Sequence, residues 1–458
     1  MTFGHFLKQA RIARGLSQAE AGRPVMTKAF VSLLEHDRAR PSASTLGHLA
    51  KQLQFPLADF LSMLSTRTVG RVLADFDRQA QTALSQRRYG AAHAGFLELR
   101  TLARASGSAA ADVAATLGLG ETLLGRRDLV EARDLLRDAL EGARRLRDRL
   151  MECRALTGLG LVAHRRGQLD EAVRRYRAAL QLIPALARPA PVLHGELLLY
   201  MSTMMFRIGN LEESRNAALE SLELLDAHAP HRSAEARMNL GVVYYRSGEY
   251  GRAAEEYRHA LRTAEQFEDL QTIFRVRKNL AMVLIEAGEP RAALEHLTLS
   301  VTMARRLGDV AGECQALTEL GRCRLAVGAV AEARTAAEEA IARSRGAGKS
   351  DEVARASIVL GAATAATHQS QKALRYLSDA YRHSTQAGMR FEAIVAGRIL
   401  ARLTLRSGKP AQADRLYTEV FAALRHLAPH EAYGVLQMAK TYDRVIDPAF
   451  ESVPVQVP

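Results

Sequence analysis

Two small-residue markers recur along most of this 458-residue chain with a period of about 40 residues. The first marker falls at Ala80, Gly120, Gly160, Ser202, Gly241, Ala281, Gly321, Gly361 and Ala401. The second marker falls at Ala92, Ala132, Ala172, Ser214, Ala253, Ala293, Ala333, Ala373 and Ala413. Turn-forming glycines lie between the two markers at Gly125, Gly167, Gly209, Gly248, Gly288, Gly328 and Gly408. This regularity over nine units predicts a linear stack in which each unit contacts only its neighbours.

The clearest unit is residues 238–261, which read MNLGVVYYRSGEYGRAAEEYRHAL. Apolar or small residues recur three to four positions apart on both sides of Gly248, so the unit is predicted to be a hairpin of two helices. The small Gly241 and Ala253 are expected where the two helices cross. The large Tyr257 is expected to face the neighbouring hairpin. The unit resembles a tetratricopeptide repeat, although that repeat usually has 34 residues.

The resemblance implies an all-α fold with a right-handed TPR-like α-solenoid of about nine helical hairpins. We expect the repeat array over residues 69–425, a capping helix over 426–446 and a flexible tail over 447–458. One step between markers is 42 residues long and coincides with Pro184–Pro191, which is expected to be a loop between two units.

The first 64 residues do not follow the repeat and are predicted to form a separate five-helix domain. Ser17, Thr27 and Ser42 are residue types that cap helix N-termini. Residues 65–68 are expected to be a short linker to the array. The five helices are predicted over residues 3–13, 17–22, 27–36, 42–53 and 57–64.

This N-terminal domain resembles the Xre/Cro-type helix-turn-helix family. The resemblance lies in RIARGLSQAEAG, in TKAFVSLLEHDRARPSASTLGHLAKQL and in PLADFL. Two departures are visible: the turn between the second and third helices is one residue shorter and contains Pro24, and Asp37 replaces the glycine that often ends the third helix. The resemblance implies DNA binding.

Residue chemistry also favours DNA as the partner of this domain. The N-terminal residues of a helix in the major groove reach base edges, so small and polar side chains at the start of the third helix could read sequence. A helix N-terminus attracts phosphate, and arginines after the third helix could contact the backbone. The alternative is a helical bundle with a solvated basic face. The predicted DNA-binding residues are Ser17, Gln18, Thr27, Lys28, Ala29, Ser32, Arg38 and Arg40.

The first helix of each hairpin is expected to line the concave side of the array, which is the usual binding surface of a solenoid. Asn239 and Asn279 occupy equivalent positions in adjacent units, and their carboxamides could hold a peptide main chain at two points. This arrangement resembles peptide-binding TPR proteins. The alternative is that each asparagine bonds a neighbouring helix. The predicted peptide-binding residues are Phe206, Met238, Asn239, Tyr245, Arg275, Lys278, Asn279, Met282 and Arg322.

Composition narrows the remaining function classes. The net charge of +13 suggests a polyanionic partner or reflects a basic composition, and charge alone does not separate the two. The three cysteines lack ligand spacing and are expected to be buried thiols, so no metal or other cofactor is expected. No matched acid, base and nucleophile is visible, and we expect no enzyme activity. The lack of a signal peptide or a long apolar run predicts a cytoplasmic protein without membrane contact.

An N-terminal helix-turn-helix followed by a TPR-like array resembles peptide-responsive quorum-sensing transcriptional regulators. The resemblance implies a homodimer that binds a palindromic operator on double-stranded DNA and a small signalling peptide or protein segment. The alternative hypothesis is a DNA-tethered scaffold whose array binds a protein partner, with no small peptide ligand.

Overall fold

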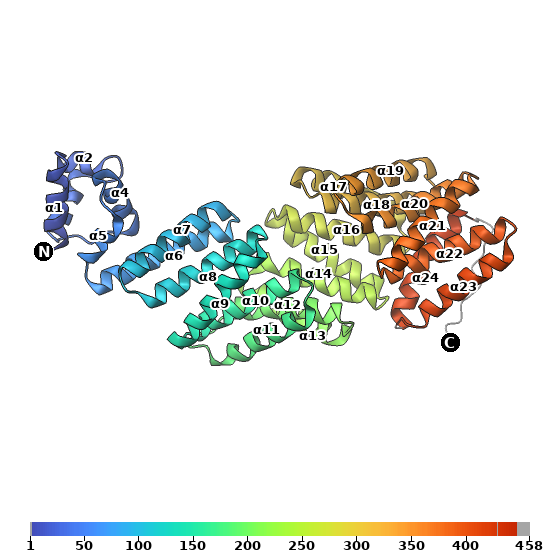
Figure 1. Cartoon of the computed structure of the whole chain (residues 1–458), viewed down its shortest axis with the longest axis horizontal. Helices are drawn as coiled ribbons and strands as arrows, with labels where there is room; N and C mark the ends of the chain where they lie inside the picture. Colours follow the sequence, from blue (N-terminus) through green and yellow to red (C-terminus); the bar gives the residue numbers. More distant parts are fainter. Residues whose placement is uncertain (1, 428, 447–458) are drawn as a thin grey trace. The chain divides into compact units, whose positions relative to one another are not determined.

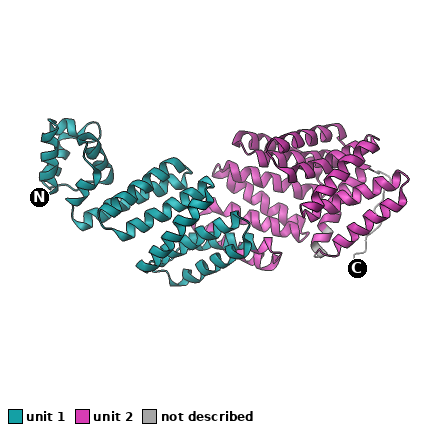
Figure 2. Cartoon of the chain, in the orientation of Figure 1, with its two compact units in different colours: residues 1–204 teal, residues 205–458 magenta. Residues whose placement is uncertain are grey.

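The computed structural model describes residues 2–427 and 429–446, and every regular element in these ranges is a helix (Figure 1). The chain divides into two compact units, residues 1–204 and 205–458, which Figure 2 shows in separate colours. The unit boundary lies inside the predicted repeat array. The prediction of helices without strands is confirmed for the described residues.

The N-terminal domain contains five short helices close to their predicted positions. Ser17, Thr27 and Ser42 are N-caps, as expected, and each accepts a hydrogen bond from a backbone N–H in the first turn of its helix. Ser17 also donates its backbone N–H to the Glu20 carboxylate, which completes a capping box. The helices are α1 (Phe3–Ala13), α2 (Gln18–Gly22), α3 (Lys28–Glu35), α4 (Ala43–Leu53) and α5 (Leu57–Ser62).

The residues predicted to be a linker belong to a helix. Ser65 is the N-cap of α6 (Thr66–Ser85), so residues 66–68 form its first turn. The core of the N-terminal domain, with Leu46 and Phe60, continues without a break into Val72 and Phe76 of α6. The helix α4 packs on α6, and α5 packs on α7 (Tyr89–Ala105). The N-terminal domain is therefore joined to the first hairpin by buried apolar contacts.

Nine helical hairpins follow in the described residues. Their first helices are α6, α8 (Ala109–Arg126), α10 (Arg149–Arg165), α12 (Pro191–Arg207), α14 (Pro230–Arg246), α16 (Leu270–Glu286), α18 (Val310–Ala326), α20 (Ser350–Ala366) and α22 (Arg390–Arg406). Their second helices are α7, α9 (Leu129–Leu146), α11 (Leu169–Leu182), α13 (Leu211–His228), α15 (Tyr250–Gln266), α17 (Pro290–Leu307), α19 (Val330–Gly346), α21 (Ser370–Gln386) and α23 (Pro410–Leu424).

Several hairpins close by packing a large side chain on the first marker. The Tyr257 ring lies against Gly241 of its own hairpin, and its hydroxyl is hydrogen-bonded to Asn279 of the next hairpin, so this side chain contacts both. The ring can approach because Gly241 has no side chain; a Cβ there would lie 2.7 Å from the ring. The same pairing, sixteen residues apart, recurs at Gly120 with Leu136, Gly160 with Tyr176 and Gly361 with Leu377.

We expect Gly241→Ala and Gly251→Ala to change stability in opposite directions. A methyl group at 241 overlaps the buried Tyr257 ring, and such overpacking costs about 1–3 kcal/mol. Gly251 lies in α15, and a Cβ there would meet nothing within 4 Å, so alanine should add about 0.5–1 kcal/mol through helix propensity. Urea unfolding of both variants tests the pair, and equal effects would contradict the packing role of Gly241.

Most of the predicted turn glycines are confirmed. Gly167, Gly209, Gly248, Gly288, Gly328 and Gly408 have φ between 74° and 86°, a region that favours glycine. The prediction of a turn at Gly125 is wrong, because this glycine lies inside α8 and faces the Tyr89 ring. Arg127 takes the left-handed conformation of that turn, with φ 68°. The predicted loop at Pro184–Pro191 contains part of a short 3₁₀ helix, Ile183–Ala185, and ends where α12 begins.

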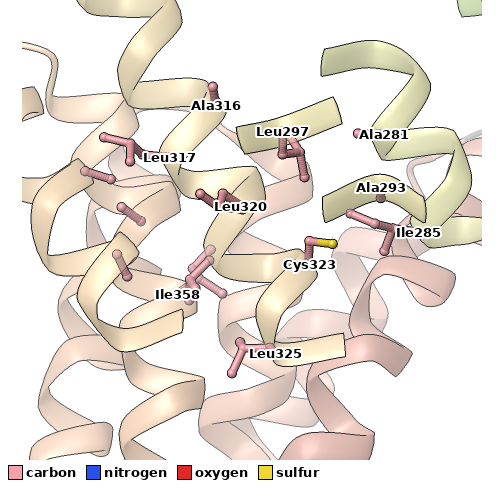
Figure 3. Close-up of a cluster of buried hydrophobic side chains, with 14 of the residues drawn as sticks. Ala281, Ile285, Ala293, Leu297, Ala316, Leu317, Leu320, Cys323, Leu325 and Ile358 are labelled. Carbon is pink, nitrogen blue, oxygen red and sulfur yellow. The ribbon is translucent and has the colours of Figure 1, made fainter. Parts of the chain in front are cut away.

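The core of the second unit is formed by small and branched side chains from successive hairpins. Figure 3 shows Ala281, Ile285 and Ala293 of one hairpin beside Leu320 and Cys323 of the next. Their close spacing follows from the alanine markers, which let the helices approach.

The last described helix, α24 (Pro429–Ile446), does not simply extend the stack. It packs on the first helices α18, α20 and α22 and reaches α14. The sequence predicted a helix here that covers the final apolar face. The helix covers the final hairpin through α22, and it also extends across the first helices of earlier hairpins of the second unit, which are called the inner helices below. Its apolar residues recur along one side, which suits such packing.

Candidate functional site

The start of α3 is the candidate DNA-reading surface. Thr27, Lys28 and Ala29 are exposed, and Ser32, one turn later, is half-buried. Thr27 accepts a hydrogen bond from the Phe30 backbone N–H at 3.2 Å, so its hydroxyl also fixes the first turn. The surface is thus accessible in the folded chain, with one cation and several small side chains.

Two further predicted residues, Arg38 and Arg40, lie in the segment that follows α3, and both are exposed. They belong to the same N-terminal domain as Ser17, which caps the start of α2. Two arginines beside a helix that presents small side chains are suited to bind phosphates that flank base contacts.

A buried ion pair holds the three helices of this surface together. The Glu35 carboxylate, on α3, accepts hydrogen bonds from Arg11 Nε of α1 at 2.5 Å and from Gln18 Nε2 of α2 at 2.8 Å. Burial acts to raise the pKa of Glu35, but the hydrogen bonds from Arg11 and Gln18 outweigh it and hold the pKa below its ordinary value. Gln18 therefore has an internal role that the sequence prediction missed.

Asp37 explains how the third helix can end without glycine. Its φ is 55°, which asparagine and aspartate tolerate better than most residues. Its carboxylate accepts a hydrogen bond from the Gly4 backbone N–H at 2.8 Å, at the start of α1. Gly4 is required there, since a side chain would meet the Glu35 and Leu34 carbonyl groups.

A second candidate site lies on the inner helices of the second unit. A cavity of about 230 Å³ is lined by Tyr245, Met282 and Arg322 among the predicted peptide-binding residues. Glu319 and Phe391 line it as well. Burial raises the pKa of Tyr245 well above its usual value, so its hydroxyl stays protonated.

Arg322 is not available to an incoming acid in this arrangement. It is 2 % exposed, and it donates from Nη1 to Glu286 at 2.6 Å and from Nε to Glu319 at 2.8 Å. The two carboxylates therefore hold the guanidinium between α16 and α18. The sequence did not reveal this, because Glu286 lies at the end of the first helix of the preceding unit.

The other predicted peptide-binding residues are spread over several environments. Met238 is buried in the core, and the Asn279 side chain is hydrogen-bonded to the Tyr257 hydroxyl of the preceding hairpin. This bond matches the alternative considered for Asn279. Asn239 is half-buried on α14. Arg275 has Nη1 3.7 Å from the Glu235 carboxylate, and its side chain is about half exposed.

Phe206, at the end of α12, contributes to a stack. The Arg246 guanidinium lies 5.7 Å from the centre of the Phe206 ring and 5.1 Å from that of Phe391. Arg246 also lines the cavity, so Phe206 is connected to it through this cation.

A polar ladder that the sequence analysis missed crosses the inner helices. Lys278 donates to Gln315 at 2.7 Å, and Gln315 donates to Glu352 at 3.2 Å. Arg355 then bridges Glu352 and Glu392, at 2.6 and 2.7 Å. Burial lowers the pKa of Lys278. Three of these four contacts join residues 37 positions apart along the chain, so a search for polar residues near the repeat period could have found them.

Comparison with known proteins agrees with this organisation. Residues 7–60 match a family model described as Helix-turn-helix, and residues 112–185, 206–266 and 275–297 match models described as Tetratricopeptide repeat. The chain therefore carries a helix-turn-helix domain followed by tetratricopeptide repeats. No curated protein sequence matches it.

Several solved structures share the fold of this helix-turn-helix TPR chain. The apo form of the quorum sensor NprR from B. thuringiensis has a TM-score of 0.62 and 14 % identity, over 76 % of this chain and 97 % of that one. The STAND protein with a tetratricopeptide repeat sensor, PH0952 from Pyrococcus horikoshii, has a TM-score of 0.57 and 14 % identity, over 84 % of this chain and 57 % of that one.

A third relative was solved with a peptide. The Rap conjugation gene regulator of the plasmid pLS20, in complex with the Phr* peptide, has a TM-score of 0.50 and 13 % identity, over 81 % of this chain and 97 % of that one. At these identities the similarity shows the fold.

The remaining expectations from the sequence concern the cysteines, a metal site and membrane-spanning helices. Cys153, Cys314 and Cys323 are buried thiols, and burial raises the pKa of Cys153 to about 11. Within residues 2–427 and 429–446, no group of three or more His, Cys, Asp or Glu side chains is arranged to hold a metal ion. None of the helices described has the length and apolar composition needed to cross a membrane.

Proposed function

We propose that this protein is a sequence-specific DNA-binding transcriptional regulator whose repeat array senses a peptide and alters DNA binding. The N-terminal domain binds double-stranded DNA through Ser17, Gln18, Thr27, Lys28, Ala29, Ser32, Arg38 and Arg40. The protein acts in the cytoplasm as a homodimer, so that two domains engage half-sites about one helical turn apart on a palindromic operator.

The observation that carries the DNA-binding proposal is the exposed start of α3. Lys28 and Ala29 are open to a partner there, and Arg38 follows on the same domain. The Arg11–Glu35 pair fixes α3 against α1, so the reading surface is preformed and loses little conformational freedom on binding.

The proposal of a peptide ligand is supported by the inner surface of the second unit. Tyr245 and Met282 offer apolar surface beside the charged groups of the cavity, which suits a short peptide. The Rap conjugation gene regulator, a protein of this fold, was solved in complex with the Phr* peptide.

The alternative, a DNA-tethered scaffold, is favoured by one observation. The helix α24 already lies across several inner helices, so little open groove remains for a peptide in the described arrangement. A protein partner could instead bind the outer surface of the array.

The mechanism we propose is a shift between two populations. A ligand that contacts several inner helices favours one spacing of the hairpins over another. Because the N-terminal domain shares its core with the first hairpin, a change in that hairpin is passed to α3. DNA affinity then rises or falls with the ligand.

We expect Lys28→Ala and Arg38→Ala each to weaken DNA binding about 10-fold at moderate salt, since each removes a cation from the DNA surface. DNA selected from a random library by the wild-type chain serves as the probe in gel shifts over a salt series. Arg38→Ala should also reduce the salt slope by about one phosphate contact.

Arg67→Ala is the matched control, because Arg67 is an exposed cation on α6, outside the N-terminal domain. The DNA affinity of the Arg67→Ala variant should stay within about twofold of that of the wild type. If Arg67→Ala loses as much affinity as Arg38→Ala, binding reflects overall charge, and the assigned surface is wrong.

A further inference from the structure

The helix α24 lies in the second unit as a bound amphipathic helix would. It contacts α18, α20 and α22 and reaches α14, all of which are first helices of their hairpins. Its residues Val435, Ala439, Tyr442 and Ile446 are buried, at spacings of four, three and four positions. Amphipathic helices bind apolar grooves through side chains at this spacing.

A carboxylate anchors the C-terminal half of α24. Asp443 is 2 % exposed, and its two oxygens lie 2.6 Å from Arg398 Nη2 and 2.9 Å from Arg402 Nη1. Both arginines belong to α22, and Arg406 of the same helix donates to the Ile446 carbonyl at 2.7 Å. Three cations of one inner helix thus hold the end of α24.

A cavity lies along the side of α24 that faces the inner helices. Glu431, Gly434 and Met438 line the 230 Å³ cavity between α24 and the inner helices. A side chain at Gly434 would meet nothing within 4 Å. Protein cores are close-packed with few voids of this size. The side of α24 that faces this cavity is therefore incompletely packed against the inner helices.

We propose that α24 is an internal ligand of the inner surface, and that Arg398 and Arg402 form a carboxylate-binding site that Asp443 fills. The external ligand is then a peptide with an acidic residue and apolar side chains three and four positions apart. This peptide displaces α24 and forms the same contacts with the inner helices. This inference rests on the proposed peptide sensing and names the chemistry of its ligand.

Competition between the two ligands follows from tethering. A helix joined by a short connection has an effective concentration on the order of millimolar at its site. The apparent affinity of an external peptide is reduced by the fraction of molecules in which α24 has left. Weakening the Asp443 contact should therefore strengthen external binding without any change in the groove.

The test uses the full chain and a fluorescent synthetic peptide with the sequence of residues 429–446. Fluorescence anisotropy measures binding to wild type, to Asp443→Ala and to Arg444→Ala, which changes an exposed residue of α24. We expect Asp443→Ala to bind the peptide at least 10-fold more tightly than the other two proteins. A peptide that itself carries Asp443→Ala should bind the Asp443→Ala protein at least 10-fold more weakly.

Hydrogen exchange supplies a second readout that separates displacement from unfolding. In Asp443→Ala, exchange should become faster in residues 429–446, while α15 and α17 keep their protection. Equal peptide affinity for all three proteins, or loss of protection throughout the second unit, would overturn the proposal. Neither assay contains DNA or a signalling peptide. A negative result would therefore overturn the role of α24 only, and the proposed DNA binding is tested separately by the gel shifts.

Discussion

Arg322→Ala should lower the stability of the second unit by about 3 kcal/mol or more. The substitution removes the guanidinium that lies 2.6 Å from Glu286 and 2.7 Å from Glu319. Glu286 is 3 % exposed, so its charge would be left in the interior without a partner, a change that typically costs about 3–5 kcal/mol. Thermal unfolding followed by circular dichroism should show a transition about 10 °C lower.

Arg334→Ala is the control for the Arg322 prediction. Arg334 also pairs with a glutamate, Glu338, but both side chains are about half exposed. Such surface pairs contribute about 0–1 kcal/mol, so the transition should move little. Similar shifts in the two variants would show that burial of Arg322 has no special weight.

Glu35→Ala should destabilise the N-terminal domain by about 3 kcal/mol, because it leaves the Arg11 guanidinium and the Gln18 amide without their shared partner. Local hydrogen exchange over residues 3–62 measures this directly. DNA affinity should fall in parallel, since α3 loses its anchor to α1. Glu131→Ala, an exposed site in α9, should change neither quantity.

The effect of Glu35 should also depend on pH. Its pKa is lower in the folded domain than in the unfolded chain, so the charged form stabilises the fold at neutral pH. That contribution is present above the unfolded pKa and is lost as the pH falls through the folded value. The stability difference between wild type and Glu35→Ala should therefore shrink below about pH 4. A constant difference from about pH 7 to about pH 3 would contradict the role given to the carboxylate.

The hairpins could be predicted from the sequence because their determinants are local. Gly241 and Ala253 mark a helix crossing at fixed spacing, and Ser17 and Thr27 carry cap chemistry that depends on the next three residues. The same locality explains the error at Gly125, where contact with Tyr89 of an earlier hairpin decides the role of the glycine.

The inner surface could be predicted only in part, since its contacts join residues far apart in the chain. The sequence indicated that Tyr245 and Met282 face inward, and both line the cavity. It could not indicate that Glu286 neutralises Arg322, or that Asp443 reaches Arg398 over 45 residues. These pairings depend on how successive hairpins stack, which a period alone does not specify.

The shared core of α4, α5, α6 and α7 sets where this protein can be divided. A fragment that ends at residue 64 would leave the apolar side of α4 and α5 without Val72 and Phe76. A fragment extended through α7 keeps those contacts. We therefore expect it to be soluble, in contrast to the fragment that ends at residue 64. A chimaera that takes its DNA specificity from a related protein would therefore need the first hairpin of that protein together with its five N-terminal helices.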